Sequence, residues 1–164
     1  MKLLYIELES VFNNEGESRE FDYDFSIDDD EMIASPVNVK GSVFNRSGIV
    51  TLSATAEYDV SAPCALCASP VNKHCRVPVE HILLAYIGNE EDYDKYIVVE
   101  NMRLDLDDLV REDVFLAMPS RYLCRKDCKG LCPVCGADLN LGACNCEKPT
   151  DGRWDALKEL FEGN

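Results

Sequence analysis

The sequence predicts an α+β protein: an antiparallel β domain, barrel-like or a sandwich, with one helix, followed by a cysteine-rich metal-binding segment and a C-terminal helix. Two patterns predict this class. Apolar and polar residues alternate through much of the first hundred residues, as in half-buried strands, and six of the nine cysteines lie between Cys124 and Cys146. The chain has no repeating strand–helix–strand unit, which argues against a parallel, doubly wound sheet.

The strand predictions follow the period-two pattern in chain order. The segments that carry it are residues 4–8, 21–25, 37–43, 49–60, 75–85 and 96–99. Between the third and fourth segments, residues 45–48 read Asn-Arg-Ser-Gly, a turn signal that predicts a hairpin. Residues 15–18 and 88–92 are predicted to be exposed acidic loops. An antiparallel sheet is therefore expected.

Two helices are predicted after the strands. Residues 106–117 carry an apolar stripe near helical spacing, and Asp105 or Asp107 is suited to cap its start. The second helix is expected over residues 151–161, with Trp154, Leu157, Leu160 and Phe161 on one face. Pro119 stops the first helix. We therefore expect two domains, residues 1–120 (acidic β domain ending in a helix) and 121–164 (zinc-binding segment with C-terminal helix).

Charge separates the same two regions. The 164-residue chain has 31 acidic and 16 basic residues, a net charge of -15. Residues 1–120 hold 24 acidic and 9 basic side chains, whereas residues 121–148 have a net charge of +2. A chain this acidic repels a phosphate backbone, which excludes a general nucleic-acid coat protein.

The compartment is predicted from the N-terminus and the cysteines. The apolar run at residues 3–6 ends at Glu7, shorter than a secretory or membrane-spanning segment requires. We expect a soluble cytoplasmic protein without membrane partners. In a reducing cytosol, clustered thiols bind metal more often than they form disulfides, and nine cysteines cannot all pair internally.

The cysteine-rich segment contains a zinc-knuckle turn, Cys132-Pro133-Val134-Cys135-Gly136. Two intervening residues let both sulfurs reach one ion, and a glycine next to them can take the positive φ that turns amides toward the sulfurs. Cys144 and Cys146 supply a second pair, so four thiolates could close a structural Zn²⁺ site. The alternative is a set of reduced, unliganded thiols, which would leave this polar segment little to hold it together.

The roles of the other five cysteines remain open at this point. Cys64 and Cys67 form a third pair, and Cys124 and Cys128 a fourth. These four could form a second zinc site that clamps the C-terminal segment to the sheet, or some could be unliganded or replace a sulfur in the first site. A redox role for Cys64 and Cys67 is less favoured, because a turn and a strand follow them and not a helix. Cys75 lies in a strand-like run and is predicted to be a small buried hydrophobe.

No catalytic constellation is present in the sequence. The chain has two histidines, no His-Glu-x-x-His motif and no phosphate-binding glycine loop. Its acidic runs at residues 28–31 and 105–108 are typical of solvated faces or helix starts. We therefore expect a protein that is not an enzyme.

The C-terminal half resembles the YceD family. Leu109-Val110-Arg111-Glu112, the Met118-Pro119 step, the Cys128–Gly136 stretch, Asn140, Cys144 and Cys146, and Asp151–Trp154 fit its pattern. Cys64 and Cys67 match an upstream pair of the family, although Leu66 and Ala68 depart from the arginine within that pair and the leucine after it. The resemblance covers about residues 60–162 and implies a role in the accumulation of large-subunit (23S) rRNA, with no established enzymatic activity.

Two functional interpretations follow from this resemblance and the charge pattern. The first is a ribosome biogenesis factor whose acidic domain binds a basic large-subunit ribosomal protein, while the cysteine segment approaches precursor rRNA. Its candidate contacts are Arg121, Arg125, Lys126 and Lys129. The second is a binding module or chaperone for one basic ribosomal protein, without RNA contact. A redox or nuclease enzyme comes last.

Overall fold

The computed structural model describes residues 5–28, 30–86 and 95–146. In chain order its elements are β1 (Tyr5–Glu7), α1 (Glu9–Asn13), β2 (Ser18–Phe25), β3 (Val37–Arg46), β4 (Ile49–Pro63), β5 (Pro70–Leu84), β6 (Ile97–Val98), a 3₁₀ turn (Glu100–Met102), β7 (Arg103–Asp105) and α2 (Leu106–Ala117). The helix predicted over residues 151–161 lies outside the described residues, as does the acidic loop predicted at residues 88–92.

The chain divides into two compact units. The sheet unit comprises Met1–Ala62 and Val71–Ser120. The cysteine-rich unit comprises Pro63–Pro70 and Arg121–Asn164, of which the structure describes residues up to Cys146. The second unit therefore includes the connection between β4 and β5, which a division at residue 120 assigns to the β domain.

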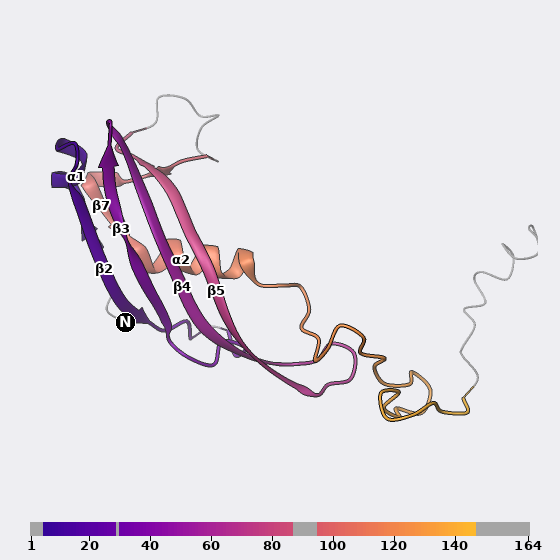
Figure 1. The fold of residues 1–164 in the computed structure, drawn as a ribbon. Coiled ribbons are helices and arrows are strands. Elements are labelled where there is room, and N and C mark those ends of the chain that lie inside the picture. The colour runs from indigo at the N-terminus through magenta and orange to yellow at the C-terminus, as the bar shows by residue number, and fades with distance from the viewer. Residues whose placement is uncertain (1–4, 29, 87–94, 147–164) are drawn as a thin grey trace, which may run out of the picture. The chain divides into compact units, whose positions relative to one another are not determined.

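The described strands form two open sheets. Five strands are ordered β2-β3-β4-β5-β6, and β1 pairs with β7 in a separate two-stranded sheet. Figure 1 shows β2, β3, β4 and β5 side by side, with α2 across one face. The fold is mixed α+β with a body made mainly of sheet, as predicted, but barrel-like or sandwich closure is not confirmed.

Strand pairing follows the turn signals in the sequence. β2, β3 and β4 pair antiparallel, and Ser47 and Gly48 take φ values of 55° and 80° in the β3–β4 turn. Positive φ at two central residues is the geometry of a tight hairpin turn. The antiparallel prediction is wrong for β6, which pairs parallel to β5 through Leu83 and Leu84. The short α1 was not predicted either.

The core lies between the sheet and α2. Alternate residues of β4 from Val50 to Ala62 are buried, and Leu52 and Leu83 are 0% and 1% exposed. The Asp105 carboxylate caps α2 by accepting from the amides of Asp107 (3.1 Å) and Asp108 (3.3 Å). This confirms Asp105 as the cap, and acidic residues in the first turn favour the positive end of the helix dipole.

The inward face of β5 is less completely covered than its sequence predicts. His81 on this face contacts Asp113 of α2, with 2.7 Å between Nε2 and Oδ2. Val77 and Val79 are buried, but burial decreases toward the start of the strand, so Cys75 is only half-buried. The prediction that Cys75 is a buried hydrophobe is therefore wrong.

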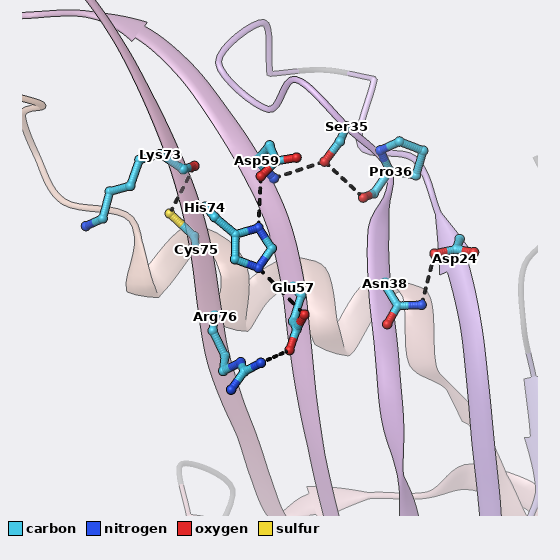
Figure 2. A network of polar contacts seen from close by, with 10 residues as sticks. All are labelled: Asp24, Ser35, Pro36, Asn38, Glu57, Asp59, Lys73, His74, Cys75 and Arg76. Atoms are coloured by element: carbon cyan, nitrogen blue, oxygen red, sulfur yellow. Dashed lines mark hydrogen bonds and ion pairs between the residues drawn. The ribbon is translucent and has the colours of Figure 1, made fainter.

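The opposite face of the sheet is polar. Figure 2 shows His74 of β5 between Glu57 and Asp59 of β4, with Arg76 beside Glu57. His74 Nδ1 lies 2.9 Å from the Asp59 carboxylate. Farther along the sheet, Asn38 of β3 donates to Asp24 of β2 at 3.0 Å. Cross-strand pairs of this kind support register, while their energy is limited by exposure to solvent.

Candidate metal centre

Eight of the nine cysteines form two groups of four within the cysteine-rich unit. We call Cys132, Cys135, Cys144 and Cys146 the knuckle cluster, and Cys64, Cys67, Cys124 and Cys128 the loop cluster. Within each cluster the four sulfur atoms lie within 4.8 Å of one another. Cys75 belongs to neither cluster. Each set of sulfurs is close enough to surround one metal ion.

The knuckle cluster is built on the turn predicted from the sequence. The amide of Gly136 donates to the carbonyl of Cys132 at 2.8 Å, and the amide of Cys132 donates to Ala137 at 2.8 Å. The Val134 amide points at the Cys132 sulfur, 3.4 Å away. Gly136 has a φ of 72°, the conformation that a glycine adopts without steric penalty.

The loop cluster repeats this backbone arrangement. The amide of Ala68 donates to the carbonyl of Cys64 at 2.9 Å, and the amide of Cys64 donates to Ser69 at 2.8 Å. Ala68 holds the position that Gly136 holds in the other turn, with a φ of 59°. Both Cys-x-x-Cys pairs are thus knuckles of the same type. The sequence analysis did not predict a knuckle at Cys64 and Cys67, because the residue after Cys67 is alanine and not glycine.

The remaining sulfurs of the loop cluster come from the segment after α2. Cys124 Sγ lies 3.5 Å from Cys67 Sγ, and Cys128 Sγ lies 3.9 Å from Cys64 Sγ. The amide of Ala65 donates to the carbonyl of Tyr122 at 2.8 Å, which ties the two segments together beside the sulfurs. Cys64, Cys67 and Cys128 are buried and Cys124 is exposed.

Each cluster contains one sulfur that is readily ionised and one that is not. Backbone amides, chiefly that of Cys124, lower the pKa of Cys64 to about 6, and the amides of Cys135 and Val134 lower that of Cys132 to about 6. The neighbouring Cys67 raises the pKa of Cys124 to about 12, and Cys135 raises that of Cys146 to about 12. Crowded thiolates repel one another, so both clusters favour a cation that would neutralise them.

The donor set fits a structural metal site. Four sulfurs per cluster leave no position for water or substrate, and the amide-to-sulfur bonds of the knuckles would disperse the charge of bound thiolates. The two clusters could therefore each hold a metal ion.

The basic residues predicted to contact RNA or a partner lie exposed in the same unit. Arg125 and Lys126 lie between Cys124 and Cys128, and Lys129 follows Cys128. Arg125 pairs loosely with Asp127, with 3.8 Å between Nε and the carboxylate. Arg121 is exposed at the start of the unit. Their side chains are accessible to a ligand.

One polar side chain of the site was not predicted in this role. Asn140 lies between Cys135 and Cys144, and its side-chain amide donates to the sulfur of Cys128 at 3.5 Å. The sequence marks Asn140 only as part of a family pattern. Its contact with a sulfur of the other cluster depends on the folded path of the chain.

Gly136→Ala is expected to weaken metal binding at the knuckle cluster about tenfold. A Cβ at positive φ costs roughly 1–2 kcal/mol, and folding of the turn is coupled to binding. The measurement is Cd²⁺ affinity by competition with a chelator. Gly142→Ala is the matched control. An added Cβ meets nothing within 4 Å at either glycine, but only Gly136 has a positive φ. Equal affinities of the two variants would contradict a requirement for positive φ in the turn.

The fold and the site define a protein that joins a sheet unit to a cysteine-rich unit with two candidate metal centres. Among the described residues, no helix is long and apolar enough to cross a membrane. Residues 52–161 match the family described as large ribosomal RNA subunit accumulation protein YceD. The chain belongs to this family, as its motifs predicted.

Several relatives share most of this region. Uncharacterized protein Rv2926c of Mycobacterium tuberculosis is 32% identical over 118 residues, which cover 68% of this chain and 56% of the relative. Uncharacterized protein YlbN of Bacillus subtilis is 25% identical over 130 residues, 78% of this chain and 76% of the relative. The chain thus spans little more than half the length of the mycobacterial relative. No solved structure matches the chain.

Proposed function

We propose that this protein is a non-enzymatic, cytoplasmic ribosome biogenesis factor that supports accumulation of 23S rRNA. The observation that carries the proposal is the YceD family match over residues 52–161, a region that contains both cysteine clusters. The family description itself names large-subunit rRNA accumulation. Each cluster supplies four protein sulfurs, which would fill the coordination sphere of one ion and leave no open position for a substrate. This suits a structural site better than a catalytic one.

Each cluster, in this proposal, holds one structural Zn²⁺. Zn²⁺ prefers tetrahedral thiolate coordination, and sulfur-only donors with knuckle backbones are typical of structural zinc. When bound, the ion supplies a rigid cross-link of the chain. Cys64 and Cys132, whose pKa values are lowered to about 6, provide the first thiolates.

The principal partner is a basic large-subunit ribosomal protein. Residues 1–120 hold 24 acidic and 9 basic side chains, so this region carries a charge equal to that of the whole chain, -15. Such a field attracts cationic proteins and increases the rate of association at low salt.

Precursor rRNA is a weaker, orienting contact in this proposal. The segment 121–148 has a net charge of +2, and each occupied four-thiolate zinc site carries about -2. The unit is therefore not strongly attractive to phosphate. Arg125, Lys126 and Lys129, with Arg121, would contact RNA once the partner protein holds the factor in place.

The test compares binding to naked 23S precursor rRNA with binding to isolated basic ribosomal proteins, from about 50 to 300 mM salt. We expect weak RNA binding with a shallow salt slope, of roughly one to three phosphate contacts. We expect tighter, salt-sensitive binding to a basic ribosomal protein. The Arg125→Ala/Lys129→Ala variant should lose the RNA contact and keep the protein contact. The matched control is Lys40→Ala/Arg103→Ala, which removes two exposed cations of the sheet unit.

Three other outcomes would revise the proposal. Tight binding to RNA alone, abolished by Arg125→Ala/Lys129→Ala, would make the cysteine-rich unit the main RNA reader. Binding to the ribosomal protein with no measurable RNA contact would favour the chaperone. Binding to neither would contradict both.

A further inference from the structure

The two cysteine clusters are joined through the side chain of Asn140. This residue lies in the loop that both starts and ends in the knuckle cluster, at Cys135 and Cys144. Its Nδ2 donates to Cys128 Sγ in the loop cluster at 3.5 Å. Its Oδ1 accepts from the backbone amide of Lys129 at 2.8 Å. Asn140 is thus carried by one cluster and bonded to the other.

The backbone around this contact holds three segments together. Leu131 forms an antiparallel bridge with Asp138, and the amide of Leu139 donates to the carbonyl of Gly130 at 2.9 Å. The amide of Leu131 donates to the carbonyl of Leu66 at 3.0 Å. Residues 128–131 therefore have the loop-cluster knuckle on one side and the 138–140 segment on the other.

Gly130 shows how close this packing is. It has a φ of 74°, and a Cβ there would lie 2.9 Å from the carbonyl oxygen of Leu66. The segment between the clusters consequently has little room to shift.

The conformation of Asn140 depends on its own loop. Its backbone amide and its Nδ2 both donate to the Asp138 carboxylate, at 2.9 and 2.7 Å. The loop has little apolar burial to order it, since Leu141 is 89% exposed. An ion held by Cys135 and Cys144 would fix both ends of the loop and so position Asn140.

We propose that Asn140 couples the two metal sites, so that occupation of the knuckle cluster raises the metal affinity of the loop cluster. Asn140 is a positioning residue: its amide stabilises the Cys128 thiolate, and thiolate stabilisation favours the bound ion. By linkage, occupation of the loop cluster raises the affinity of the knuckle cluster by the same factor. This inference rests on the proposed metal sites.

The first test measures Cd²⁺ binding to the full chain by ¹¹³Cd NMR and chelator competition. Each cluster should give its own resonance in the four-thiolate range, assigned with cysteine-to-serine variants. Asn140→Ala should lower the affinity of the loop cluster about 10- to 100-fold, as is typical when an outer partner of a metal ligand is removed. It should also shift the loop-cluster resonance. Asn145→Ala is the matched control: it removes an exposed asparagine of the same unit, between Cys144 and Cys146, and should leave the loop-cluster affinity unchanged.

Asn140→Asp separates the bond that the side chain accepts from those that it donates. The aspartate keeps an acceptor for the Lys129 amide but removes the donor to Cys128 and Asp138 and adds a negative charge. We expect it to lower the loop-cluster affinity at least as much as Asn140→Ala. Recovery of wild-type affinity in Asn140→Asp would overturn the role of the amide-to-sulfur bond.

A double-mutant cycle tests the coupling itself. Cys135→Ser, which disables the knuckle cluster, should lower the loop-cluster affinity, and adding Asn140→Ala should lower it much less than in the intact protein. Additive effects would overturn the coupling while leaving the two metal sites in place. A chain that binds no Cd²⁺ at either cluster would instead overturn the proposed metal sites, and this outcome is distinguishable because no cadmium resonance would appear in the four-thiolate range.

Discussion

Cys132→Ser is expected to unfold the part of the cysteine-rich unit around the knuckle cluster and to leave the sheet unit folded. The knuckle cluster loses a sulfur that is buried and easily ionised, and the proposed ion would lose one of its four thiolates. In small zinc-binding peptides, metal binding supplies on the order of 10 kcal/mol at neutral pH, and that energy is the folding energy. The described part of this unit has no regular helix and few buried apolar side chains that could replace the folding energy supplied by metal binding.

Limited proteolysis measures this result. Trypsin should cut Cys132→Ser rapidly between Arg121 and Lys148 and leave β2 to β5 resistant. Far-UV circular dichroism should retain the strand signal. Cys75→Ser is the matched control, because it removes a thiol that belongs to neither cluster, and its digestion pattern should equal that of the wild type. Resistance of Cys132→Ser between Arg121 and Lys148 would contradict a structural role for the metal.

Metal affinity is expected to fall at least 100-fold between pH 8 and pH 6, about 2.7 kcal/mol. Metal ions bind thiolates, so each ion must displace the protons that its ligands still carry. The pKa values of Cys124 and Cys146 are raised to about 12, so at least one proton per cluster is released throughout this range. Protons therefore compete with the ion, and affinity decreases as pH decreases.

The dependence should become steeper below pH 6. Cys64 and Cys132 are mainly thiolates above their pKa values of about 6 and become protonated below them. At least two protons per cluster are then released on binding, so affinity should fall at least 100-fold per pH unit. Chelator competition at fixed pH gives the affinity, and an indicator dye in weak buffer counts the protons. An affinity that is constant between pH 8 and pH 6 would show that the bound species does not require these thiolates.

The sequence predicted the local features of the sheet well. Alternation along residues 49–60 is a strong signal because each inward residue of β4 is buried. The turn at Ser47 and Gly48 was predicted equally well. Two successive residues with positive φ require small or polar residue types, and the sequence places such residues at 45–48. Closure of the sheet and the parallel pairing of β6 could not be predicted, because they depend on which distant strands meet. The α1 helix, Glu9–Asn13, is too short to show helical periodicity.

The candidate site was partly predictable for a similar reason. Cysteine spacing identifies pairs, because two intervening residues fix the distance between sulfurs in a turn. Which pairs share an ion is a question of tertiary structure, and the sequence left it open for Cys64 and Cys124. The amide of Asn140 contacts Cys128 only because two loops pack side by side.

The loop cluster also has a consequence for the unfolded chain. Its cysteines Cys67 and Cys124 are 57 residues apart in the sequence, so an ion held there would close a long loop containing β5 and α2. Such a cross-link reduces the conformations open to the denatured polypeptide, by about 4 kcal/mol in the entropic model used for disulfides. During synthesis the knuckle of Cys64 and Cys67 leaves the ribosome well before Cys124 and Cys128 do. A metal cross-link at this cluster would therefore form only after β5 and α2 have both been made.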